Sequence, residues 1–162
     1  MTAGWNFERR RDTCARFLIG VSMLAKAHAE RDTSLEAVRN RMRLSPEEAL
    51  FAARRLNEEE LIVFAVGGAV RSKARGVERA EAVTRAVIAK AQRHDDVLRT
   101  LRAGGTELAV VAAVLRAAGA PLACGAPDDD AARSYRLALV GDAVTLERQR
   151  DDGAFEAVSL AG

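Results

Sequence analysis

Residues 33–56 read TSLEAVRNRMRLSPEEALFAARRL, and this stretch predicts two short helices joined by a sharp turn. Ser34 can cap the first helix, because its hydroxyl can accept a free amide hydrogen of the opening turn. Ser45 can cap the second helix, where Pro46 takes the first helical position and needs no amide donor. Since only two residues lie between the helices, the sequence predicts a helix-turn-helix unit.

Apolar residues in both helices recur at spacings of three and four, which places them on one face of each helix. The inner face of the second helix is expected to consist of Ala49, Leu50, Ala53 and Leu56. We expect a single core, shared with the first helix of the chain, to contain Leu35, Val38, Leu50, Leu56 and Ile62.

A β-hairpin is predicted directly after this unit. Residues 61–66 are β-branched, aromatic or otherwise apolar, Gly67 and Gly68 follow, and residues 69–73 form a second run. Two such runs around a Gly-Gly pair indicate a hairpin, because a tight turn of this kind needs positive φ at its centre.

Helix, turn, helix and hairpin, in this order, resemble the winged helix-turn-helix family over roughly residues 8–93. In that family a glycine commonly precedes the Leu-Ile pair, and here Glu60 stands at that position. A hydroxyl residue usually lies three positions before the glycine that follows the wing, and Lys73 replaces it here. The resemblance implies a mostly α protein with small β elements, of α+β class.

The flanking elements are expected as follows. A first helix covers residues 7–28, with Cys14 on its apolar stripe and His28 at its end, and a helix after the hairpin begins at Gly76 and runs to about residue 93. Asp95 is expected to cap a short helix. The Gly104-Gly105 pair then marks a boundary between a domain at 1–103 and a segment at 104–162.

The C-terminal segment is expected to be a small α+β unit. A helix over residues 108–118 closes at Gly119, and residues 120–130 form a loop. Alternating apolar residues between 135 and 160, interrupted by turns at 141–142 and 152–153, predict a three-stranded antiparallel meander.

Composition fits an ordinary globular protein, with 49% apolar and 30% charged residues among 162. No apolar run is long enough to span a bilayer, so no contact with a membrane is expected. The N-terminus lacks the pattern of a secretory signal, and two cysteines are too few for a disulfide framework. We therefore expect a cytoplasmic protein.

Motifs for catalysis, cofactors or metals are not found in the sequence. The two histidines are 66 positions apart, and the glycine pairs lack the lysine and further glycines of a phosphate-binding loop. The run Asp128–Asp130 is expected to be a solvated acidic loop, with a hard cation as the alternative. The expectation is a binding protein that is not an enzyme and that holds no cofactor or metal.

Charge is distributed unevenly along the chain. Residues 1–93 hold 18 Lys or Arg against 12 Asp or Glu, a net charge of +6, and residues 94–162 hold 7 against 11, a net charge of −4. A basic first part and an acidic second part favour a polyanionic partner for the first part.

The resemblance also implies an interface, because in this family the second helix of the unit usually enters the major groove of double-stranded DNA. The groove-facing positions would be Ser45, Glu47, Glu48, Phe51, Ala52 and Arg55. The expected DNA-binding residues are Arg39, Arg41, Arg43, Ser45, Arg54, Arg55, Arg71, Lys73 and Arg75. The helix after the hairpin commonly pairs with its mate in this family, which implies a homodimer. Residues 77–93 and 7–28 are its expected contact, because their apolar coverage is wider than one neighbour needs.

Three functions stay open at this point. The first is a dimeric, DNA-binding transcription regulator of winged-helix type. The second is a winged helix used as a protein-interaction or assembly module, which the acidic start of the second helix and the acidic tail favour. The third is a regulator that senses a small ligand, or an enzyme whose site the sequence does not reveal.

Overall fold

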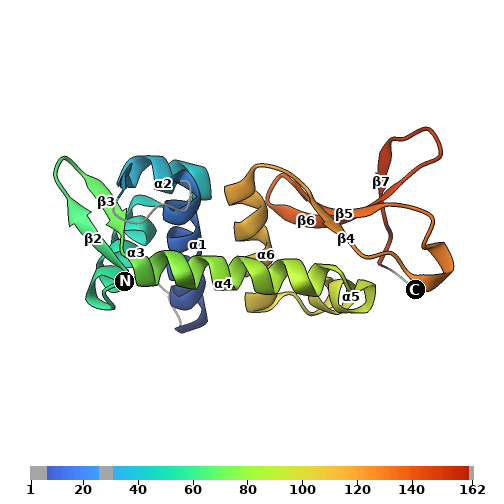
Figure 1. Cartoon of the computed structure of the whole chain (residues 1–162), viewed down its shortest axis with the longest axis horizontal. Helices are drawn as coiled ribbons and strands as arrows, with labels where there is room; N and C mark the ends of the chain where they lie inside the picture. The colour runs from blue at the N-terminus through green and yellow to red at the C-terminus, as the bar shows by residue number, and fades with distance from the viewer. Residues whose placement is uncertain (1–6, 26–30, 161–162) are drawn as a thin grey trace. The chain divides into compact units, whose positions relative to one another are not determined.

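The computed structural model describes residues 7–25 and 31–160. These residues form six α-helices, one short 3₁₀ helix and two antiparallel sheets (Figure 1), a mixed α/β architecture. They pack into two compact units, unit 1 at residues 1–83 and unit 2 at residues 84–162.

The two units divide within helix α4 (Ala74–Ala91), ahead of the Gly104-Gly105 pair at which the sequence placed the boundary between 1–103 and 104–162. Packing explains the difference. The Gly125 amide donates a 2.8 Å hydrogen bond to the Ala91 carbonyl at the end of α4, and Val97 is part of the core of unit 2. The segment between α4 and the glycine pair is therefore built into unit 2.

Unit 1 combines three helices and the first part of α4 with a small sheet. The helices are α1 (Phe7–Leu24), α2 (Leu35–Met42) and α3 (Pro46–Glu58). The sheet has the antiparallel order β1-β3-β2, with β1 (Asp32–Ser34), β2 (Ile62–Ala65) and β3 (Ala69–Ser72). In Figure 1 the β2–β3 hairpin, drawn in green, projects from the helices of this unit. The predicted hairpin is confirmed, and β1 is a strand that the sequence did not predict.

The two predicted helix caps are present. The Ala37 amide donates a 3.2 Å hydrogen bond to the Ser34 hydroxyl. At the start of α3 the Glu48 amide donates to the Ser45 hydroxyl at 3.1 Å, and the Ser45 amide donates to the Glu48 carboxylate at 2.9 Å. This reciprocal capping box satisfies two amides that have no partner within the helix.

The turn between α2 and α3 is held from α1. Arg43 is the C-cap residue of α2, and its φ of 53° lies in the left-handed region that residues other than glycine rarely adopt. The Arg16 guanidinium, which comes from α1, donates to the carbonyl oxygens of Met42 and Arg43, the latter at 3.3 Å. A cation on these carbonyls also complements the negative end of the α2 dipole.

The core of unit 1 confirms part of the prediction. Val38, Leu56 and Ile62 are buried and Leu35 is half-buried, but Leu50 is 39% exposed, so its placement in the core was wrong. The inward face of α3 is formed by Ala49, Ala52, Ala53 and Leu56. The three alanines let α3 lie close to its neighbours, and Leu50 falls at the margin of that face. Ala52, expected in a DNA groove, is fully buried and was also wrongly placed.

Two backbone positions set the entry to and exit from the hairpin. Glu60, at the position where the winged-helix family commonly has glycine, adopts φ of 60°. Gly76 lies where a β-carbon would approach the Leu61 carbonyl oxygen to 2.2 Å, so only glycine fits there. Gly76 thus permits close packing, and α4 begins before it, at Ala74.

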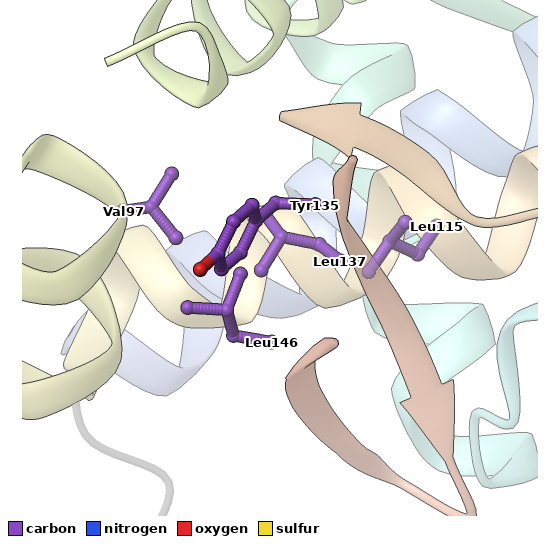
Figure 2. Close-up of a cluster of buried hydrophobic side chains, with 5 residues drawn as sticks. All are labelled: Val97, Leu115, Tyr135, Leu137 and Leu146. Atoms are coloured by element: carbon purple, nitrogen blue, oxygen red, sulfur yellow. The ribbon is translucent and has the colours of Figure 1, made fainter. Parts of the chain in front are cut away.

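Unit 2 contains helices α5 (His94–Ala103) and α6 (Gly105–Ala118) and a four-stranded antiparallel sheet. The strands, in sheet order, are β4 (Leu122–Cys124), β5 (Tyr135–Val140), β6 (Ala143–Gln149) and β7 (Phe155–Ala157). Figure 2 shows Val97, Tyr135, Leu137 and Leu146 pointing toward one another, with Leu115 beside Leu137.

The structure of unit 2 differs from the sequence prediction at residues 120–130 and at the start of α5, and agrees with it at the end of α6. Residues 120–130 were expected to be a loop, but β4 lies there and pairs with β5, so the sheet has four strands. The prediction that Asp95 caps α5 was wrong: Arg93 is the N-cap residue, its side chain makes no capping hydrogen bond, and Asp95 lies in the first turn of the helix. The expected closure of α6 by Gly119 is confirmed, with φ of 68°.

His28, expected at the end of the first helix, lies outside the described residues. Among the helices that are described, none has the length and apolar character that crossing a bilayer would require.

The left-handed conformation at Glu60 generates a stability prediction. Replacing Glu60 with Gly removes a side chain that disfavours this backbone conformation, and the ion pair removed with it, to Arg75 at 3.9 Å, is exposed. We expect the free energy of unfolding to rise by about 1 kcal/mol in urea titrations.

Glu78→Gly is the matched control, because Glu78 is an exposed glutamate within α4. That change should lower the free energy of unfolding by about 1 kcal/mol, the usual cost of glycine in a helix. An equal loss of stability in both variants would show that Glu60 is not strained.

Candidate interface around α3

An open groove of about 1180 Å³ runs along unit 1 between α1 and α3. Leu18 and Leu56 line it as buried residues, Phe51 is half-buried and Leu50 is exposed. Arg79 of α4 also lines the groove. The outer face of α3 is therefore partly apolar and accessible.

Charged side chains of both signs surround these apolar residues. Arg55 pairs with Glu58 at 3.6 Å and with Glu59 at 3.4 Å, and Arg79 pairs with Glu59 at 3.8 Å. Within the part of the chain that the structure describes, Arg54 and Glu47 have no hydrogen-bond or ion-pair partner. Both are exposed, so they can meet a ligand without first giving up an internal partner.

The edge of the groove formed by α1 contacts α3 through arginines. The Arg10 guanidinium lies 5.9 Å from the centre of the Phe51 ring, a cation–π distance, and Arg9 lies 3.8 Å from the Glu48 carboxylate. Because Glu48 also accepts the Ser45 amide, its carboxylate is occupied by the capping box. Glu48 therefore orders α3.

Cys14 lines the same groove without being activated. Burial, followed by the negative charge of Glu59, raises the pKa of the Cys14 thiol to about 11. Burial likewise raises the pKa of Cys124 in unit 2 to about 11. Both side chains are therefore neutral thiols near pH 7, which fits packing residues and does not fit nucleophiles.

Among the described residues, at least four of the nine sequence-predicted DNA-binding residues have carboxylate partners. Arg39 pairs with Glu36, Arg55 pairs with Glu58 and Glu59, Arg71 pairs with Asp32 at 2.7 Å, and Arg75 pairs with Glu60 at 3.9 Å. The Arg71 pair crosses from β3 to β1, which the sequence did not reveal. Each partner carboxylate reduces the positive potential that its arginine can offer to a phosphate.

The other five predicted residues differ in their roles. Ser45 is occupied as the cap of α3, while Arg41 and Arg43 are exposed at the end of α2. Arg54 is exposed on α3, and Lys73 is half-buried directly after β3. Among the described residues no hydrogen bond or ion pair involves the Lys73 side chain, so it too can meet a ligand directly.

The hairpin tip contributes no charge to this face. Phe64 is 47% exposed on β2, and Val66, in the turn before Gly67 and Gly68, is 97% exposed. An uncharged tip with apolar side chains can contact a ligand by packing, but it adds no attraction for phosphate.

The acidic run Asp128–Asp130 forms the short 3₁₀ helix of unit 2. Asp130 accepts the Tyr135 hydroxyl and lies 3.4 Å from Arg133, while Asp128 and Asp129 are exposed. Through burial and this contact with Asp130, the pKa of Tyr135 is raised. In the described ranges no group of three or more His, Cys, Asp or Glu side chains is placed to hold a metal ion.

Part of this interface was within reach of sequence reasoning. The Arg55 pairs follow from helical spacings of three and four, which place oppositely charged side chains together. The exposure of Leu50 was missed, because helical spacing alone does not show whether a residue lies at the centre or at the margin of the inner face.

Comparison of the chain with models of protein families, with curated proteins and with solved structures gave no match.

Proposed function

We propose that unit 1 is a winged-helix domain and that the protein is a regulator that binds double-stranded DNA through the outer face of α3. Support comes from the element order α1-β1-α2-α3-β2-β3 and from the pairing of β1 with β3. The observation that carries the proposal is the orientation of α3 in unit 1. Its alanine-rich face is buried, and Arg54 on the opposite side is exposed.

The charges around α3 favour contacts with phosphates over the reading of bases. Arg41, Arg43, Arg54 and Lys73 suit phosphate contacts, which supply affinity and position a protein without selecting a sequence. Glu47 at the leading end of α3 opposes phosphate, and a carboxylate gains only where it accepts a hydrogen bond from cytosine. We therefore expect binding that is modest in affinity and strongly dependent on salt.

A specific observation favours a second function, a protein-interaction module that does not bind DNA. Leu50 is exposed and Phe51 half-buried on the face proposed for DNA, and at least four of the arginines predicted to bind DNA have carboxylate partners among the described residues. Apolar side chains among charges of both signs are common in protein interfaces.

Anisotropy of a labelled duplex of mixed sequence, measured at several salt concentrations, tests the DNA proposal. Replacing both Arg54 and Lys73 with Ala should weaken binding to all sequences similarly and lower the salt slope by about one for each phosphate that is no longer neutralised. Glu47→Gln should strengthen binding, because it removes a repulsive charge. Glu48 is not changed, since its carboxylate belongs to the capping box.

Arg75→Ala is the control, because that guanidinium already lies beside Glu60. It should reduce affinity less than the double variant does. If the wild-type protein binds no duplex at low salt, the interaction module replaces the DNA-binding regulator.

We also propose that the protein is a homodimer through α4 and α1. Ile88 of α4 is 40% exposed and Met23 of α1 is exposed, so each helix presents an apolar side chain without cover from its own unit. Sedimentation at high micromolar concentration should show a dimer for the wild type and a monomer for Ile88→Asp.

Val140→Asp serves as the control for this change. Val140 is also an exposed apolar residue, but it lies at the end of β5. This variant should remain dimeric, and a monomeric wild type would rule out the homodimer.

A further inference from the structure

We propose that the α1–α3 groove is a docking site for an acidic amphipathic helix of a protein partner, and that this helix and DNA exclude each other. The docking site is argued from the shape and charge of the groove alone. Only the mutual exclusion rests on the proposed function, because it requires that DNA use the same face of α3.

The shape of the groove favours a helix as its occupant. It is bounded by two packed helices, and side-chain ridges of a third helix fit into a channel of this kind. Leu18 and Leu56 line it as buried residues, while Leu50 and Phe51 offer accessible apolar surface. An amphipathic helix would bury this surface with apolar side chains spaced three and four apart.

The charge of the groove favours an acidic occupant. Its lining holds five arginines and three glutamates, a surplus of two positive charges. Glu58 and Glu59 are already paired with Arg55 or Arg79, whereas Arg54 has no partner among the described residues. A helix with an apolar stripe flanked by carboxylates therefore complements the groove in both respects.

Two other occupants fit less well. Duplex DNA would satisfy the arginines, but its phosphates would be repelled by Glu47 and offer Leu50 no apolar partner. A second copy of the chain would need an acidic helix with exposed apolar residues. Among the described helices, the exposed large apolar side chains are Met23, Leu50 and Ile88, and the last lies close in sequence to Arg85 and Lys90.

Exclusion follows from shared residues. Arg54 lines the groove and is also one of the residues proposed to contact phosphate directly. A carboxylate of the partner helix beside Arg54 would neutralise the charge that a phosphate needs. The partner would therefore release the protein from DNA.

The experiment pans a phage-displayed library of helical peptides, with unbiased composition, against the full chain. Peptides enriched on the wild type should be amphipathic and carry net negative charge. Their affinity should fall about tenfold or more for Leu50→Ser and for Arg54→Ala, since each removes an exposed side chain that lines the groove. Val66→Ser is the matched control, an exposed apolar residue on the hairpin outside the groove, and should bind like the wild type.

Circular dichroism and urea unfolding of the three variants verify that each is folded. No enrichment, enrichment of basic peptides, or binding that is unaffected by both groove variants would overturn the docking site. The selected peptide should also displace a labelled duplex from the protein. Peptide binding without any duplex binding would refute the DNA proposal alone, duplex binding without peptide binding would refute the docking site alone, and simultaneous binding of both would refute the exclusion.

Discussion

The face of α3 that we propose as a binding surface depends on hydrogen bonds from the Arg16 guanidinium to the last carbonyl oxygens of α2. These bonds join α1 to the turn at which Arg43 adopts a left-handed conformation. The turn sets where Ser45 stands, and the capping box of Ser45 and Glu48 then sets where α3 begins. One buried face of small residues fixes the rotation of α3. The direction in which Arg54 points is thus a consequence of contacts made on the other side of the helix.

The chemistry of this face is a balance between arginines and nearby carboxylates. Arg71 is paired across the sheet with Asp32 and Arg55 is paired along α3, so each offers less positive potential to an anion than Arg54, which has no partner among the described residues. Exposed ion pairs of this kind contribute little to stability, and a stronger anion can therefore take over such an arginine at low cost. Leu50, on the same face, adds exposed apolar surface for which phosphates offer no partner. Both ligand classes proposed here follow from this composition.

Local chemistry explains which features the sequence could predict. Helix caps at Ser34 and Ser45 and the Gly67-Gly68 turn depend on neighbouring residues, so the sequence alone indicated them. The short strands β1 and β4 were missed because each is only three residues long and is defined by pairing with a distant strand. Leu50 was misplaced because helical spacing gives the width of an apolar face, whereas packing against α1 decides which residues occupy its centre. The Asp32 partner of Arg71 was hidden for the same long-range reason.

The most direct test of the central claim, that α3 presents the binding face, is an NMR titration of the isotope-labelled full chain with a short duplex at low salt. We predict that the amide signals that shift most come from residues 45–58 and from the exposed end of α2 at Arg41 and Arg43. Within α3 the buried residue Ala53 should shift less than its exposed neighbours, and the β5 strand should shift least of all. Shifts concentrated in unit 2, or no shifts at any duplex concentration, would contradict this claim.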